Sequence, residues 1–156
     1  MNDLVTQFEE VRLVYRNKTL ASERPKVNCA STAYEIFLKS WDKDQIQLFE
    51  ECKILLLDNH FRMMSIANIS RGSMSETLVD PRAIFAIALK RRANCIIMAH
   101  NHPSGVLKPS RADIELTKRL SSLGEMMRIP LEDHLIISPN GFSSIIHDDL
   151  RSLEPC

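Results

Sequence analysis

Two histidines, a serine and an aspartate have the types and spacing of a catalytic metal site. His100 and His102 are separated by one residue, and Ser110 and Asp113 follow as Ser-x-x-Asp. Imidazole nitrogens and carboxylate oxygens are ligands that Zn²⁺ accepts, and three protein ligands leave the fourth tetrahedral position open for water. His100, His102 and Asp113 therefore predict a zinc site of the catalytic kind.

The flanking sequence predicts where these ligands lie. Residues 95–98 are apolar, as in a central strand covered on both faces. Alternate residues of a strand share a face, so His100 and His102 can point to one ion while Asn101 points away. Residues 109–124 have the apolar spacing of an amphipathic helix. We therefore expect the ligands at a strand end and a helix start.

Each part of the motif also has a purely structural interpretation. Ser110 and Asp113 match the N-cap and the first-turn acidic residue of an ordinary helix, and a single His-x-His is common without a metal. The complete set, preceded by an apolar strand and followed directly by Pro103, favours the metal site.

The rest of the chain predicts a layered α/β domain, with helices packed on a mixed sheet. Apolar periodicity and an Asp-Pro helix start predict helices over residues 31–41 and 80–90. Apolar runs and turn signals predict strands over residues 51–57, 61–69, 133–138 and 142–147. Residues 1–27 are set apart as an N-terminal extension with a candidate edge strand over 10–16, and residues 28–156 as a single domain.

Composition narrows the classes of function. The 156 residues carry 20 basic and 20 acidic side chains, and this zero net charge argues against broad electrostatic binding of DNA. The four cysteines form no Cys-x-x-Cys pair, and there is neither a signal-peptide pattern nor a membrane-spanning apolar run. We expect a cytoplasmic protein with reduced thiols and no membrane partner.

Three segments resemble the RadC-like branch of the JAMM (JAB/MPN) zinc metalloproteins. They are Ala-His-Asn-His-Pro-Ser-Gly at 99–105, Pro-Ser-Arg-Ala-Asp at 109–113 and Asp-His-Leu-Ile-Ile at 133–137, and the resemblance covers residues 28–147. It implies a cytidine-deaminase-like JAMM fold, a mixed β-sheet flanked by helices that carries one zinc ion. Residues 28–156 would then form one RadC-like JAMM domain.

The resemblance also implies roles for individual residues. His100, His102 and Asp113 would bind zinc, and Ser110 would hydrogen-bond near the metal water and the tetrahedral intermediate. JAMM enzymes use an upstream glutamate as general acid and base, and alignment with the family places Asn68 there. An amide cannot take a proton from water at neutral pH, so Asn68 predicts weakened catalysis.

Asp133 and His134 form a second polar pair that the resemblance places near the site. Under one interpretation His134 hydrogen-bonds a metal ligand. Under the other, the pair begins a strand and is satisfied by backbone groups. The sequence leaves both open.

The function implied by the resemblance is a zinc metallopeptidase or isopeptidase, in which metal-activated water attacks an amide of a peptide or protein substrate. The alternative is a weakly active or inactive zinc-binding module for protein interaction, which Asn68 favours. A link to DNA repair is implied only by the name of the RadC group. A deaminase is set aside because its His-x-Glu and Pro-Cys-x-x-Cys zinc signature is absent. The sequence does not indicate an oligomeric state.

Overall fold

In the computed structural model, the described residues are 14, 16, 18–72 and 79–147. The candidate edge strand over residues 10–16 lies outside these residues except for Val14 and Arg16, neither of which is in a strand. A short 3₁₀ turn, η1 (Ala21–Glu23), precedes the main domain.

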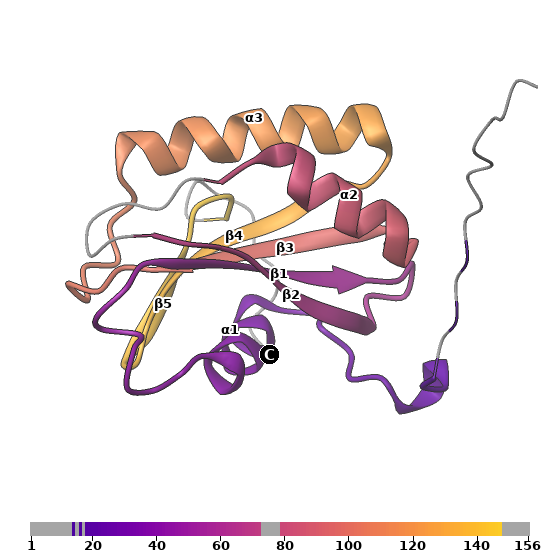
Figure 1. Ribbon diagram of the computed structural model, residues 1–156, viewed down its shortest axis with the longest axis horizontal. Helices are drawn as coiled ribbons and strands as arrows, with labels where there is room; N and C mark the ends of the chain where they lie inside the picture. The colour runs from indigo at the N-terminus through magenta and orange to yellow at the C-terminus, as the bar shows by residue number, and fades with distance from the viewer. Residues whose placement is uncertain (1–13, 15, 17, 73–78, 148–156) are drawn as a thin grey trace, which may run out of the picture.

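Helices and strands follow one another much as the sequence predicts (Figure 1). Their order is α1 (Ala30–Ser40), β1 (Glu51–Leu57), β2 (Met63–Arg71), α2 (Pro81–Arg91), β3 (Cys95–Asn101), α3 (Arg111–Met127), β4 (Leu131–Ser138) and β5 (Gly141–Ser144). Asp80 caps α2 by accepting a hydrogen bond from the Arg82 N–H, and Pro81 occupies the first turn.

The strands form one mixed sheet in the order β2-β1-β3-β4-β5. β1 and β2 form an antiparallel hairpin, β1 pairs antiparallel with β3, and β4 pairs antiparallel with β5. β3 and β4 are parallel, and α3 makes the crossover between them. This topology places the carboxyl end of β3 beside the start of α3.

Helices cover both faces of the sheet: α1 lies on one face, and α2 and α3 lie on the other (Figure 1). On the α1 side, Phe37 and Trp41 pack with Leu55 and Ile97. On the other side, Ile84 and Leu120 pack with alternate strand residues that include Ile54, Ile96 and Met98. β3 is buried along its whole length, as expected of a central strand in a three-layer α/β domain.

Two elements end three residues from their predicted ends: β5 stops at Ser144 instead of residue 147, and α3 continues to Met127 instead of stopping near Gly124. Gly124 is a close-packing position inside the helix and not its end. A Cβ there would lie 2.7 Å from the Ile129 carbonyl oxygen. The helix ends at Arg128, which has the left-handed conformation (φ 54°). Glycine is the most common residue in this conformation at helix ends, but other residues also adopt it.

Cys52 and Cys95 are free and buried. The expectation of a reduced thiol fails for Cys29, which is disulfide-bonded. Among the described residues, no helix is both long and apolar enough to cross a membrane.

Candidate metal centre

The structure brings His100, His102 and Asp113 together at the carboxyl end of β3. His100 is in the strand and faces α3, His102 follows the strand, and Asp113 is in the first turn of α3. The side chain of His100 is 5% exposed, whereas those of His102 and Asp113 are 17% and 14% exposed. The cluster is therefore closed toward the core and open toward solvent on one side.

The ligand atoms lie within a few tenths of an ångström of the spacing in a tetrahedral metal site. His100 Nε2 lies 2.9 Å from His102 Nε2 and 3.2 Å from Asp113 Oδ1, and His102 Nε2 lies 3.6 Å from Asp113 Oδ2. Bonds of about 2.0–2.2 Å at tetrahedral angles separate ligand atoms by about 3.3–3.6 Å. The donor set of two imidazoles and one carboxylate thus fits a divalent metal ion.

A local turn sets the protonation of His102. Gly105, at φ 76°, closes a turn in which its N–H donates to the His102 carbonyl at 2.9 Å. The Val106 carbonyl then lies 2.7 Å from His102 Nδ1. A carbonyl only accepts, so Nδ1 must carry a proton. When the ring is neutral, the lone pair of Nε2 therefore points into the cluster.

Electrostatics keep Asp113 ionised. Burial opposes its charge, but the interactions with His100 and His102 outweigh burial and lower the pKa of Asp113. In return, the hydrogen bond to Asp113 is the largest cause of the raised pKa of His102. In the metal-free protein Asp113 thus favours the protonated form of His102, and a metal ion bound there would supply that positive charge instead.

Ser110 lies at the opening of the cluster and also caps α3. Its Oγ accepts a hydrogen bond from the Asp113 N–H at 3.1 Å, and its own N–H donates to Asp113 Oδ2 at 2.6 Å. This capping box holds the carboxylate in place. Both interpretations of Ser-x-x-Asp are therefore compatible here, because the helix cap is also what orients the candidate ligand.

The two residues of the Asp133–His134 pair lie in different surroundings. His134 Nε2 is 2.7 Å from His100 Nδ1, so His134 contacts a candidate ligand directly. Asp133 contacts Ser144 Oγ and the His134 N–H through Oδ1, at 2.7 Å in both cases. Within the described part of the chain, the Asp133 Oδ2 atom is buried without a hydrogen-bond partner. Burial is the main cause of the raised pKa of Asp133.

The structure does not bring Asn68 to the cluster. Asn68 is exposed on β2 and pairs with Lys53 of β1. Directly paired residues share a face, and Lys53 is on the α1 face, where its Nζ donates to the Ser40 carbonyl at 2.7 Å and lies 4.5 Å from the centre of the Trp41 ring. Asn68 therefore lies on the side of the sheet away from His100.

A carboxylate that the sequence analysis missed lies near enough to the cluster to act on it electrostatically. Glu50 lies immediately before β1, two residues from Cys52, which pairs with His100. Its negative charge adds to the hydrogen bond that Asp113 accepts in raising the pKa of His102, and to burial in raising the pKa of Cys52. The alternation of side chains along a strand could have indicated this residue. Glu50 is two residues before Cys52, so the two share a face, and the pairing of Cys52 with His100 shows that it is the face of the cluster.

Asn101 holds the backbone on both sides of Glu50. Its side chain lies on the opposite face from His100 and is fully buried. Its Oδ1 accepts from the Glu51 N–H at 2.7 Å, and its Nδ2 donates to the Phe49 carbonyl at 2.8 Å and to the Ile46 carbonyl. One residue of the His-Asn-His sequence thus fixes the segment that carries Glu50.

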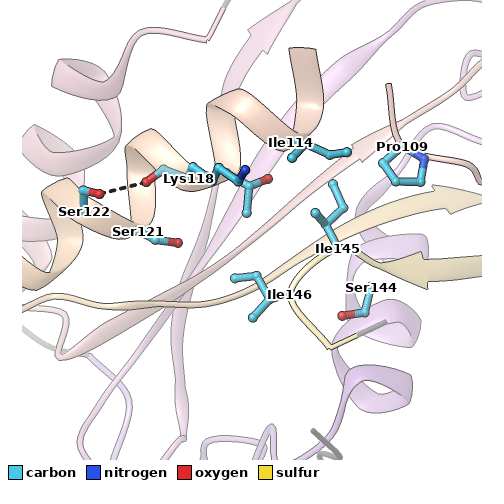
Figure 2. A pocket seen from close by; sticks show the side chains of 9 residues that line it. Pro109, Ile114, Lys118, Ser121, Ser122, Ser144, Ile145 and Ile146 are labelled. Carbon is cyan, nitrogen blue, oxygen red and sulfur yellow. Dashed lines mark hydrogen bonds between the residues drawn. The ribbon is translucent and has the colours of Figure 1, made fainter. Parts of the chain in front are cut away.

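A groove runs beside the cluster, between α3 and the residues that follow β5 (Figure 2). It has a volume of about 740 Å³, and Ile114, Ile145 and Ile146 make its lining largely apolar. Lys118 provides a cation, and the hydroxyl groups of Thr117 and Ser144, which also line the groove, contact His134 and Asp133. The groove therefore touches the residues that support the cluster.

Comparisons with known proteins agree with the fold. Residues 27–150 match the model of the RadC-like JAB domain. A UPF0758 protein of Finegoldia magna is 50% identical over 86 residues, which are 55% of this chain and 39% of that protein. A UPF0758 protein of Alkaliphilus metalliredigens is 37% identical over 128 residues, 77% of this chain and 55% of that protein. The chain spans about half the length of these relatives or less. The match over most of its length shows that the chain belongs to the RadC-like JAB domain family.

Proposed function

We propose that the chain is a zinc-dependent hydrolase that cleaves an amide bond in a peptide or an isopeptide. The observation that carries the proposal is the cluster of His100, His102 and Asp113, closed on the core side and open on one other side, with Glu50 near it. Three protein ligands with an open position are typical of a catalytic zinc site, whereas structural sites are closed.

Zinc bound there would lower the pKa of a bound water toward about 7 and polarise the substrate carbonyl. Glu50 would take the proton from the attacking water and pass it to the leaving amine. The Ser110 hydroxyl, which is exposed at the opening, would donate a hydrogen bond to the oxygen of the carbonyl under attack. The buried side of the cluster, with His134 behind His100, would keep solvent from the ligands.

The groove in Figure 2 supports a peptide substrate. It starts at Pro109, next to Ser110, and continues along α3 past Ile114 and Lys118. Apolar walls with a few polar groups are common in substrate sites. An extended chain in this groove would have aliphatic side chains against the isoleucines and an acidic group near Lys118.

Glu50→Gln tests the proposal, with Glu51→Gln as its matched control. Glu51 is the next residue, and its carboxylate lies 3.5 Å from Arg71 Nε. Hydrolysis by the zinc-loaded proteins is measured on a library of fluorescence-quenched peptides that includes an isopeptide. We expect Glu50→Gln to retain its zinc but to hydrolyse peptides about 10²–10⁴-fold more slowly than the parent, because a general base has been removed. Glu51→Gln should stay within a few-fold of the parent.

Equal rates in the Glu50→Gln and parent proteins would remove Glu50 from the chemistry. The absence of hydrolysis in the zinc-loaded parent across the library would favour the alternative of a zinc-binding interaction module.

A further inference from the structure

A chain of buried side chains leads from His100 back to the first turn of α3. His100 Nδ1 lies 2.7 Å from His134 Nε2, and His134 Nδ1 lies 2.6 Å from Thr117 Oγ1. Thr117 Oγ1 lies 2.7 Å from the Asp113 carbonyl oxygen. His134 is 0% exposed and Thr117 is 5% exposed, so water does not compete for these hydrogen bonds.

The far end of this chain fixes the direction of its hydrogen bonds. The Asp113 carbonyl can only accept, so the single hydroxyl proton of Thr117 points to it. Thr117 Oγ1 must then accept from His134, and His134 Nδ1 must carry a proton. One backbone carbonyl thus decides the protonation of a histidine on the neighbouring strand.

The direction of the hydrogen bond between His134 and His100 follows from burial. His134 is fully buried, and burial disfavours the charged imidazole, so His134 is neutral. With its proton on Nδ1, His134 has a lone pair on Nε2 and accepts from His100 Nδ1–H. The nitrogen of His100 that remains for a metal ion is Nε2, which faces His102 and Asp113.

We propose that Thr117 and His134 are positioning residues that hold the proton of His100 on Nδ1 and so keep Nε2 ready for the metal. The proposal deepens the proposed function, because it concerns the affinity of the same metal centre. His102 receives the equivalent control from the carbonyl of Val106, four residues along the chain. His100 is buried in the strand and receives it from two other elements, β4 and α3.

Removing the Thr117 hydroxyl should weaken metal binding although Thr117 touches no metal ligand side chain. His134 Nδ1 would lose its acceptor, and a neutral imidazole can then carry its proton on Nε2 instead. His134 would donate to His100 Nδ1, and the proton of His100 would shift to Nε2, inside the cluster. Loss of such an outer partner typically lowers metal affinity about 10–100-fold.

The experiment compares Thr117→Val, which keeps the shape and removes the hydroxyl, with Thr117→Ser, which keeps the hydroxyl. Ser122→Ala is the matched control, because Ser122 also donates to the carbonyl four residues earlier but on the exposed side of α3. Zinc affinity is measured by competition with a chromophoric chelator. We expect about 10–100-fold weaker binding in Thr117→Val, near-parent binding in Thr117→Ser and parent binding in Ser122→Ala.

Nitrogen-15 NMR of the imidazole rings in the metal-free parent gives a second test that needs no variant. We expect a proton on Nδ1 of His134 and none on its Nε2. A proton on His134 Nε2, or unchanged zinc affinity in folded Thr117→Val, would overturn the proposal. The NMR test remains decisive if the parent neither binds zinc nor hydrolyses peptides, so failure of the proposed function is separate from failure of this inference.

Discussion

The two faces of the sheet at the end of β3 serve different purposes, although adjacent residues supply them. His100 points toward α3 and joins a cluster of groups that attract a cation. Asn101 points toward α1 and binds only backbone, at Ile46, Phe49 and Glu51. The alternation of a strand thus separates candidate chemistry from the architecture that supports it.

The polar groups on the two faces are also satisfied differently. The imidazole of His100 contacts other side chains, those of His102, Asp113 and His134. The nitrogen and oxygen atoms of His100, His102 and Asp113 that face one another form the candidate metal site. On the α1 face, the amide of Asn101 reaches three backbone groups, and the ammonium of Lys53 reaches the Ser40 carbonyl. Because Asn101 anchors the residues that flank Glu50, the α1 face also supports the chemistry of the other face.

The largest effect expected on the α1 face is that of Asn101→Ala. It removes the partners of the Glu51 N–H and of two carbonyl oxygens, and an unpaired buried polar group costs about 1–3 kcal/mol. We expect the free energy of unfolding to fall by about 3 kcal/mol. Zinc affinity should change little, while hydrolysis falls because Glu50 is no longer held. Urea denaturation and zinc titration measure the two effects separately.

Asn68→Ala is the matched control for this prediction. Asn68 is exposed on β2 and lies away from the cluster, so its replacement should alter stability by no more than about 0.5 kcal/mol. A loss of zinc affinity in Asn101→Ala as large as in a ligand variant would show that the two faces are not separable.

A smaller effect is expected of Lys53→Met. Burial is the main cause of the lowered pKa of Lys53, and the charges of Glu51 and Asp42 oppose it. Between that lowered pKa and about 10.4, the folded state holds fewer protons than the unfolded state. Relative to Lys53→Met, the parent should therefore gain stability as pH rises through this window. At pH 7 we expect a difference within about 1 kcal/mol, the size of the contact with Trp41.

Urea denaturation of both proteins at several pH values checks the sign. A gain in parent stability as pH falls through the window would contradict the assigned cause. Zinc affinity should be the same in both proteins, since Lys53 faces α1.

The sequence predicted the ligand cluster because its signals are local. His100 and His102 follow an apolar strand, and Ser110 with Asp113 begins a helix, so chain order alone places them at one edge. The helix over 80–90 and the strands over 51–57 and 61–69 were predicted for the same reason, and the structure differs from them by only a few residues.

Features that depend on pairing between distant strands were not predictable in this way. Glu50 and Glu51 are equivalent in the sequence, and only the pairing of Cys52 with His100 shows which of them faces the cluster. Thr117 reads as one polar residue of an amphipathic helix. Its role depends on β4, which brings His134 beneath it. The interpretation of Asn68 required the face of β2, which the sequence does not determine.

Metal analysis by mass spectrometry tests the central claim most directly, on protein purified without a metal-affinity tag and with His102→Ala alongside. His60→Ala is the control, because His60 lies exposed in the turn between β1 and β2. We predict about one zinc per chain in the parent and in His60→Ala, and none in a folded His102→Ala. Folded parent protein that contains no zinc and does not bind added zinc, or zinc that persists in His102→Ala, would contradict the account.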